Sequence, residues 1–490
     1  MKSIDFIPLQ CISNNYKSST VAVIGAGPAG ITAAYQISKA GLKVDVFEAS
    51  ESVGGLAKTI TLWNQKVDIG PHRFFSNDTR VNRIWLEVAN GDYHMVNRLT
   101  RIYYRNKFYY YPLKPLEALS KLGASNAVLS MISYLWEFLN PTKLDGSFET
   151  WVKHRFGSRL YAIFFKSYTE KLWGIPCANL DGDFAAQRIK KLSLGEAVIN
   201  AFKKGKANKH RTLIDQFAYP IMGTGMIYKR MQQYIEDHGG QVHLNSPVRH
   251  ILTRKNDAYA IEFVDGTIRE FDEIISSMPL TDMVSRLPDV PTAIKSYACS
   301  LIYRNTIIVY LKIEAINLFP DNWLYIHSPE LQMGRITNFR NWVSEINCDE
   351  KNTIVAIEYW CYSEDLLWNT KDTELINLGK NELYKTGLIG NTSITDGFVL
   401  KIPKCYPVYT IGYKNKLKPV KDYLATIQHL NVIGRYGAFK YNNQDHSILM
   451  GIMAAENVIS GKKNNLWEIN TDYDVYQEKS VIIKNGLSSY

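Results

Sequence analysis

A glycine-rich turn near the start of the chain has the residue types and spacing to hold a phosphate-containing cofactor. The run Gly25-Ala26-Gly27-Pro28-Ala29-Gly30 matches the pattern GxGxxG. In that pattern the first glycine allows a tight turn, the second lets the backbone approach a pyrophosphate, and the third lets a helix pack closely on a strand. The phosphates would lie at the N-terminus of the helix, where amide N–H groups favour an anion. The turn therefore predicts dinucleotide binding.

The elements on both sides of this turn are those that a dinucleotide site requires. Residues 20–24 are apolar and rich in β-branched side chains, which predicts a buried strand. Residues 31–40 predict a helix, and residues 43–48 predict a second strand. Glu48 ends that strand, 18 residues after Gly30, where its carboxylate can accept a hydrogen bond from a ribose hydroxyl.

A second glycine pair follows Glu48 and narrows the class of cofactor. The run Gly54-Gly55-Leu56-Ala57 resembles the extension found in large flavoproteins that bind FAD through a Rossmann-type domain. That group includes amine oxidases, protoporphyrinogen oxidases, phytoene desaturases and UDP-galactopyranose mutases. The resemblance implies that this second glycine run helps to hold the pyrophosphate of FAD.

The segment Asp68-Ile69-Gly70-Pro71-His72 continues the resemblance. It is similar to the segment that passes over the flavin ring in those proteins. The resemblance implies a positional role for His72 beside the flavin N5, filled by its backbone, and makes His72 the candidate residue at the catalytic centre.

The C-terminal run from Gly434 to Gly451 (GRYGAFKYNNQDHSILMG) resembles the corresponding end of eukaryotic-type UDP-galactopyranose mutases. Helix-capping residues are present, and the free N–H groups of the capped helix can face the pyrimidine edge of a flavin and favour negative charge on its reduced form. A guanidinium in this run can pair with the pyrophosphate. His446 fits a structural role as well as a functional one. The residues assigned to FAD here are Gly434, Arg435, Asn443, Gln444, Asp445 and Ser447.

Two arginines and two tyrosines match positions where the mutases bind the diphosphate of their substrate. The resemblance assigns this role to Arg188, Arg335, Tyr406 and Tyr441. Guanidinium forks match phosphate oxygens, and phenol hydroxyls donate hydrogen bonds without adding charge. Trp323 and Tyr325 can form a stacking face for a nucleotide base, and buried sheet aromatics are an equally good interpretation.

The pattern of predicted elements indicates an α/β fold with a Rossmann-type FAD-binding domain built from residues 18–110, 212–290 and 425–465. A helical substrate domain (111–211) and a sheet-containing substrate-binding portion (291–424) are inserted, and residues 466–490 form a tail. The flavin is expected at the domain junction. Strands are expected at 242–245, 250–254, 259–264, 267–271, 273–277, 301–312, 352–359, 398–402 and 430–433, and helices at 372–387 and 445–458.

Two functions agree with these motifs. The first is an FAD-dependent sugar-nucleotide pyranose–furanose mutase that serves polysaccharide biosynthesis. The resemblance then implies that N5 of reduced FAD attacks the anomeric carbon of a nucleotide sugar, and NAD(P)H is a candidate reductant. The alternative is a flavin oxidoreductase of the protoporphyrinogen oxidase or amine oxidase type, and a flavin-bound protein without turnover is a third interpretation. The paired arginines favour the mutase.

Composition excludes several other classes. Hydrophobic residues make up 46% and charged residues 21% of the 490 residues, which is typical of a globular protein rather than a disordered one. The six cysteines have no paired spacing, so neither a disulfide scaffold nor a metal site is predicted. The net charge of +10 is scattered, apart from a basic run at residues 203–211 expected to be a solvated loop, and no nucleic-acid motif is present.

Neither a secretory signal nor a membrane-spanning run of 18 apolar residues is found, and a cytoplasmic location is expected. Residues 124–139 come nearest to such a run. They predict an amphipathic helix, with a buried position favoured over an interfacial one. The sequence leaves homo-oligomerisation open.

Overall fold

The computed structural model describes residues 19–111, 113, 115–183, 216–347, 350–470, 482–484 and 486–487. Over this part of the chain, none of the helices combines the length and the apolarity needed to cross a bilayer.

A parallel sheet of five strands forms the first layer of the molecule. Its order is β19 (Leu430–Val432), β13 (Glu273–Ser276), β1 (Thr20–Ile24), β2 (Lys43–Phe47) and β9 (Gln241–His243), and every pair is parallel. The strands come from three distant parts of the sequence, so the chain leaves this sheet and returns to it twice. A sheet built from three separate segments agrees with a discontinuous cofactor domain. The boundaries of that domain stay a prediction.

Helices pack on this sheet because their apolar faces and small residues allow close approach. Helix α1 (Pro28–Lys39) begins inside the glycine turn and packs against α16 (Gln444–Ser460). A Cβ added at Gly451 would lie 2.4 Å from the carbonyl oxygen of Ala29, so only glycine permits this contact. Helices α2 (Thr79–Ala89) and α9 (Gly225–Asp237) complete the layer.

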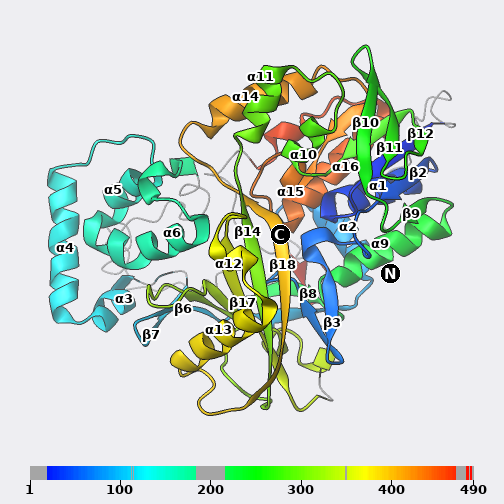
Figure 1. Ribbon diagram of the computed structural model, residues 1–490. Coiled ribbons are helices and arrows are strands. Elements are labelled where there is room, and N and C mark those ends of the chain that lie inside the picture. The colour runs from blue at the N-terminus through cyan, green and yellow to red at the C-terminus, as the bar shows by residue number, and fades with distance from the viewer. Residues whose placement is uncertain are drawn as a thin grey trace.

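A second, seven-stranded sheet lies beside the first layer (Figure 1). All its neighbouring strands are antiparallel except β15 and β6. Its strands, in order, are β18 (Ile394–Pro407), β14 (Tyr303–Ile313), β17 (Thr353–Cys361), β16 (Arg335–Asn338), β15 (Trp323–Ile326), β6 (Thr100–Tyr104) and β7 (Lys107–Tyr110). The core of this sheet is fully buried, and α13 (Asp372–Lys385) covers part of it.

A helical lobe projects from the far end of the seven-stranded sheet (Figure 1). It contains α3 (Pro115–Leu122), α4 (Ala124–Leu139), α5 (Phe148–Leu160), the π-helical turn η3 (Tyr161–Lys166) and α6 (Ser167–Trp173). Helix α6 packs against β17, which joins the lobe to the sheet.

Smaller elements connect these layers. They are β3 (Thr59–Leu62), β4 (Gln65–Asp68), β5 (Tyr93–Asn97), β8 (Gln216–Pro220), β10 (Val248–Arg254), β11 (Asp257–Phe263), β12 (Ile268–Glu270), β20 (Ile482–Ile483), β21 (Gly486–Leu487), α10 (Leu280–Ser285), α11 (Thr292–Cys299), α12 (Leu366–Asn369), α14 (Tyr413–Leu424), α15 (Gly434–Gly437) and the short turns η2 (Gly55–Ala57), η4 (Cys177–Asn179), η6 (Phe339–Asn341), η7 (Ser344–Asn347) and η8 (Leu466–Glu468).

The predicted α/β class is confirmed. The boundaries of the cofactor domain (18–110, 212–290 and 425–465) stay predictions; within the first segment, β6 and β7 belong to the seven-stranded sheet, because β6 pairs with β15. One prediction needs correction. Residues 124–139 do form a helix, but its apolar face is exposed rather than buried: Trp136 is 68% and Phe138 73% exposed. The basic run at 203–211 lies outside the described residues.

Candidate active site

The glycine turn has the geometry that its spacing predicts. Gly25 adopts a φ of 90° and donates its N–H to the Phe47 carbonyl at 2.8 Å. A Cβ added at Gly30 would lie 1.9 Å from the carbonyl oxygen of Gly25, so helix α1 sits directly on the turn. A Cβ added at Gly27 would have no neighbour closer than the Cα of Gly55, at 3.9 Å. The middle glycine therefore faces open space at the start of α1, beside Pro28 and Ala29.

The second glycine pair packs against the first glycine turn. Gly54 donates its N–H to the Ala26 carbonyl at 2.8 Å, and Gly55 has a φ of 53°. A Cβ added at Gly55 would lie 3.0 Å from the Cα of Gly27. Leu56 and Ala57 follow in the turn η2. Two stretches of side-chain-free backbone thus lie in close contact at a helix N-terminus, a place where amide N–H groups can bind a pyrophosphate group.

Glu48 is held in place by hydrogen bonds at the end of β2. Its Oε2 accepts the Ala26 N–H at 2.7 Å, and its Oε1 accepts the N–H and hydroxyl of Ser50 at 3.0 and 2.7 Å. A carboxylate has further lone pairs. The carboxylate is therefore oriented beside the glycine turn and keeps capacity for a ribose hydroxyl. These residues fit the dinucleotide part of FAD.

The start of helix α16 is fixed by its own side chains. Asn443 is the N-cap, and its backbone N–H donates to Nδ1 of His446 at 3.2 Å, which completes a capping box. This contact gives His446 a structural role. Asp445 and Ser447 are buried in the first turn. The structure therefore identifies Asn443 as the cap of this helix.

Gln444 links this helix to the segment that carries His72. Its Oε1 accepts hydrogen bonds from the hydroxyls of Thr224 and Tyr228 at 3.1 and 2.6 Å. Its Nε2 donates to the backbone carbonyl of His72 at 3.3 Å. The amide is thus engaged within the protein, and Gln444 positions the backbone at His72.

His72 is neutral. Its Nδ1 lies 3.1 Å from the carbonyl oxygen of Gly70, and a carbonyl can only accept, so Nδ1 carries the proton. Burial, together with the positive charges of Arg335 and Arg435, lowers the pKa of His72 to about 3. A neutral imidazole beside two guanidinium groups is suited to positioning rather than to donating a proton.

The low pKa of His72 predicts an acid-dependent loss of stability. Between the usual value of 6.5 and about 3, the unfolded chain binds a proton that the folded chain does not. The free energy of unfolding therefore falls as the pH drops through this window, by at most about 1.4 kcal/mol per pH unit. In His72→Gln this fall should be shallower. Urea unfolding at several pH values, at matched flavin content, measures it.

A control is available in His429, which Asp257 contacts at the surface. That contact raises the pKa of His429, so its stabilising charge is present at low pH and is lost as the pH rises. His429→Gln should therefore not make the acid dependence shallower. Equal slopes in the wild type and in His72→Gln would contradict the prediction.

Arg335 lies in the cluster, but it also has a protein partner. Its Nε donates to Oε1 of Glu358 at 2.6 Å, and its Nη2 contacts Oε2 of the same carboxylate. Glu358 stands directly opposite on β17 and is 1% exposed. Nη2 also lies 3.4 Å from the Tyr406 hydroxyl, whereas Nη1 has no hydrogen-bond partner among the described residues. The Nε and Nη2 edge of the guanidinium is thus held by Glu358, and Nη1 can still donate a hydrogen bond to a ligand.

Arg435 also contacts Tyr406, but over its ring rather than at its hydroxyl. It packs against the rings of Tyr406 and Tyr441, with its Cζ 4.9 and 4.4 Å from their centroids. Its Nε and Nη1 donate to the carbonyls of Cys405 and Asn442 at 3.1 and 2.8 Å. Nη2 has no hydrogen-bond partner in the described part of the chain. Tyr406 and Tyr441 are themselves stacked, 5.5 Å apart.

The structure bears differently on the other three residues predicted to bind substrate. Arg188 lies outside the described residues. Trp323 is 2% exposed and packs on Phe217 and Trp342, which favours the buried-aromatic interpretation. Tyr325 is half-buried and contacts Tyr168 at 5.6 Å.

Several residues of the cluster were not predicted from the sequence. Tyr168 of α6 stacks on His327 at 4.5 Å and meets Trp360 edge-on. Lys171, three residues later, donates to the carbonyls of Ile326, Ser328 and Met333 at 3.0 to 3.1 Å. These contacts fix the loop between β15 and β16, which carries Arg335. A helical spacing of three places Tyr168 and Lys171 on one face, the only sequence signal for them.

Asp68 fixes the start of the segment that leads to His72 through hydrogen bonds of its side chain. It is fully buried, and its carboxylate accepts the hydroxyls of Thr59 and Tyr219 at 2.5 and 2.6 Å and the Thr224 N–H at 3.2 Å. Burial raises the pKa of Asp68 to about 7. The Tyr310 hydroxyl donates to its carbonyl at 2.9 Å. This network positions backbone and supplies no catalytic group.

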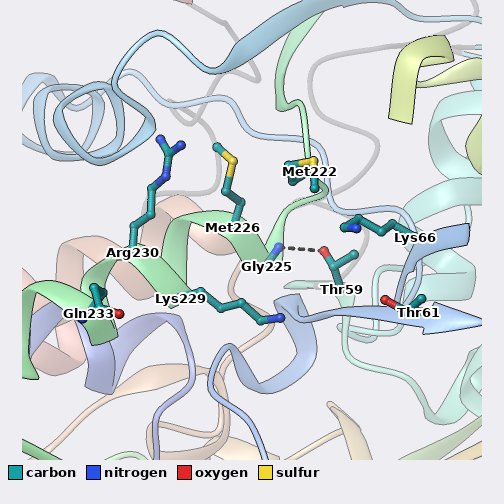
Figure 2. Close-up of a pocket in the computed structure, with 9 residues that line it drawn as sticks. All are labelled: Thr59, Thr61, Lys66, Met222, Gly225, Met226, Lys229, Arg230 and Gln233. Carbon is teal, nitrogen blue, oxygen red and sulfur yellow. Dashed lines mark hydrogen bonds between the residues drawn. The ribbon is translucent and has the colours of Figure 1, made fainter. Parts of the chain in front are cut away.

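A pocket of about 410 Å³ lies between the β3–β4 hairpin and α9 (Figure 2). The Gly225 N–H donates to the Thr59 hydroxyl at its edge, at 2.9 Å. The pocket shares no residue with the predicted site, so it is distinct from the cluster around His72. Its described lining residues are Thr59, Thr61, Lys66, Met222, Gly225, Met226, Lys229, Arg230 and Gln233.

The fold and the glycine cradle together define a flavoprotein, and comparison with known proteins agrees. Residues 28–340 match the family described as flavin containing amine oxidoreductase. This match covers more than half of the chain, and the protein belongs to that family. The family supports FAD as the cofactor, in agreement with the cradle.

The curated relatives named here are L-amino acid oxidases, and each is similar to only part of this chain. An L-amino acid oxidase of Bothrops pictus is 33% identical over 130 residues, 23% of this chain and 26% of that protein. An L-amino-acid oxidase of Naja atra is 36% identical over 115 residues, 20% and 22% of the two chains. The chain thus spans about a quarter of the length of these curated relatives.

Among solved structures, a reduced UDP-galactopyranose mutase has a similar fold. Its TM-score is 0.81 at 20% identity, over 92% of this chain and 98% of that one. A protein of Exiguobacterium sp. 255-15 that is assigned to the protoporphyrinogen oxidases has a TM-score of 0.69 at 15% identity, over 91% and 99% of the two chains. At these identities the likeness concerns the fold, and it agrees with the predicted superfamily.

Proposed function

We propose that this flavoenzyme is a sugar-nucleotide pyranose–furanose mutase. The observation that carries the proposal is the pair of guanidinium groups that contact Tyr406. Arg335 and Arg435 each have a terminal nitrogen without a hydrogen-bond partner in the described part of the chain. These terminal nitrogens and the two phenol hydroxyls can donate hydrogen bonds to a diphosphate, and the positive charge that remains beside the Arg335–Glu358 ion pair favours an anionic substrate over a neutral one.

The FAD would be held by the residues already described. The glycines of the first turn and the pair Gly54–Gly55 would contact the pyrophosphate, Glu48 would contact the ribose, and the start of α16 would face the ring. When bound in its reduced form, FAD supplies a nucleophilic nitrogen for an exchange of ring size. NAD(P)H as the source of electrons is part of this proposal.

The chain's own residues would bind and orient the substrate. Arg335 and the two tyrosines would hold the diphosphate by charge-assisted and neutral hydrogen bonds, and Arg435 would add a second positive charge. His72 would stay neutral, and its backbone, tied to Gln444, would line the ring face. Aromatic side chains around the cluster, Tyr168, Trp360 and Trp173, would exclude water. Orientation and water exclusion are the protein's main contributions to such a reaction.

An oxidoreductase is the second candidate, because the curated relatives named above are L-amino-acid oxidases. A carboxylate would also pair with Arg335 or Arg435. The two candidates differ in their electron balance. A mutase changes ring size and returns every electron, whereas an oxidase transfers two electrons from each substrate to an acceptor.

A turnover experiment separates them. The purified protein is reduced with dithionite under nitrogen and incubated with UDP-galactofuranose, and the nucleotide sugars are separated by chromatography. We expect UDP-galactopyranose to form, with the reductant needed for activity but not consumed in proportion to product. Oxygen uptake with L-amino acids, in the absence of sugar conversion, would support the oxidase instead.

A further inference from the structure

Helix α4 buries polar residues and exposes apolar ones, the reverse of an ordinary surface helix. Its fully buried residues are the polar ones: Ser130 is 0% and Glu137 4% exposed. Met131 and Tyr134 are partly buried against the core, but seven other large apolar residues point outward and are 45% to 73% exposed. These outward-facing side chains, here called the α4 face, are Val128, Leu129, Ile132, Leu135, Trp136, Phe138 and Leu139.

The inward polar residues explain why the helix cannot simply rotate. The Ser133 hydroxyl accepts the Arg159 N–H at 3.1 Å, and the Asn126 side chain accepts from the Arg159 guanidinium at 2.6 Å. The Glu137 carboxylate accepts the N–H and hydroxyl of Thr142. A Cβ added at Gly157 of α5 would lie 2.9 Å from the backbone of Tyr134. Helices α4 and α5 are therefore locked together with the apolar side turned out.

The α4 face is large enough to need a partner. Its seven members, each 45% to 73% exposed, together present several hundred Å² of apolar surface, which is at or above the few hundred Å² that a monomeric protein usually shows. A monomeric protein rarely shows such a patch without a function. A stable interface buries roughly 800 Å² on each partner, so the size of the α4 face is that of one side of a dimer.

Spacing and charge indicate which partner fits. Val128, Ile132, Leu135 and Leu139 follow each other at intervals of 4, 3 and 4 residues, the spacing of a seam that packs against another helix. Helices that lie on membranes carry Lys or Arg on their polar face. Helix α4 contains neither, and its polar side faces α5. Helix α4 also stands at the outer edge of the molecule (Figure 1), where the same helix of a second chain can reach it.

We propose that the α4 face is the interface of a homodimer, in which α4 packs against α4 of a second copy around a two-fold axis. A two-fold contact is self-complementary, so one apolar seam serves both chains. This inference does not depend on the reaction that the enzyme catalyses.

The test is the mass of the flavin-loaded, full-length protein in solution, by sedimentation velocity. We expect twice the 56.0 kDa of one chain for the wild type, and the mass of one chain for Leu135→Glu, because a charge in the seam cannot be buried there. Leu366→Glu is the matched control, because Leu366 is 90% exposed and lies on α12, outside the α4 face. It should keep the wild-type mass.

Circular dichroism and flavin content show whether Leu135→Glu is folded, and Ile132→Gln is a milder second variant. A wild type with the mass of one chain would overturn the proposal, and so would a folded Leu135→Glu that keeps the dimer mass. Flotation of a monomeric wild type with anionic phospholipid vesicles, abolished by Leu135→Glu, would assign the α4 face to lipid instead.

Discussion

Gly27→Glu is expected to give a folded protein that has lost essentially all of its flavin. Gly27 has φ −68° and ψ 176°, which any residue adopts without strain. The nearest atom to an added Cβ is 3.9 Å away, so the polypeptide itself has room for a side chain. A pyrophosphate would occupy the same room, and a carboxylate there would also repel it. Flavin absorption after purification and the thermal unfolding midpoint measure the two parts of this result.

Gly30→Ala is the contrasting control. Its added methyl group would lie 1.9 Å from the Gly25 carbonyl oxygen, so the turn and α1 must separate. We expect a loss of several kcal/mol in the free energy of unfolding, mostly from overpacking. A Gly27→Glu protein that stays yellow would show that the cofactor does not pass over this glycine.

The cofactor cradle was predictable because its determinants are local in sequence. Each glycine of the first turn is defined by its spacing, and Glu48 follows from the length of one βαβ unit. The structure places all of these residues beside one another at the N-terminus of α1. The C-terminal helix was predictable for the same reason, since Asn443 to Ser447 is a compact capping signal. The pairing of Gln444 with the carbonyl of His72 was not, because 372 positions separate the two residues.

The cluster around Tyr406 was only partly predictable. Arg335 and Tyr406 could be selected by resemblance, but the ion pair of Arg335 with Glu358 depends on the register between β16 and β17. No residue pattern within either strand gives that register, because both strands are buried and lack alternation.

Helix α4 shows a different limit of the sequence. The spacing of its apolar residues predicts an apolar face and a polar face, but it does not show which face packs against the rest of the protein. Buried was the natural choice, because most amphipathic helices turn their apolar side inward. Here the contacts of Arg159 with Ser133 and Asn126 hold the polar side inward. The prediction failed because it considered one helix without the surface of its neighbour.

The ion pair of Arg335 changes how its role must be tested. Removing the arginine alone would leave the buried carboxylate of Glu358 without a partner, which costs about 3–5 kcal/mol of stability. A loss of substrate binding would then be indistinguishable from misfolding. The double variant Arg335→Gln/Glu358→Gln removes both charges together, so two neutral amides of similar size remain in the same place.

We expect this double variant to fold, to keep its flavin, and to bind UDP about ten- to a hundredfold more weakly than the wild type. The reason is the loss of one charge-assisted contact, worth about 1.5–3 kcal/mol. Glu358→Gln alone should bind UDP at least as tightly as the wild type, because the guanidinium stays and the carboxylate that competes with phosphate is gone. Calorimetric titration of UDP into each protein gives the affinities.

The chain provides a matched control for this experiment. Arg101 forms the same kind of two-pronged pair with the buried carboxylate of Asp321, at 2.8 and 2.6 Å, but on β6, two strands away from β16. Arg101→Gln/Asp321→Asn should change stability and leave UDP affinity unaltered. If both double variants bind UDP as the wild type does, Arg335 holds the fold rather than a diphosphate. The case for a sugar-nucleotide substrate would then rest on Arg435 alone, and the oxidoreductase would become the better assignment.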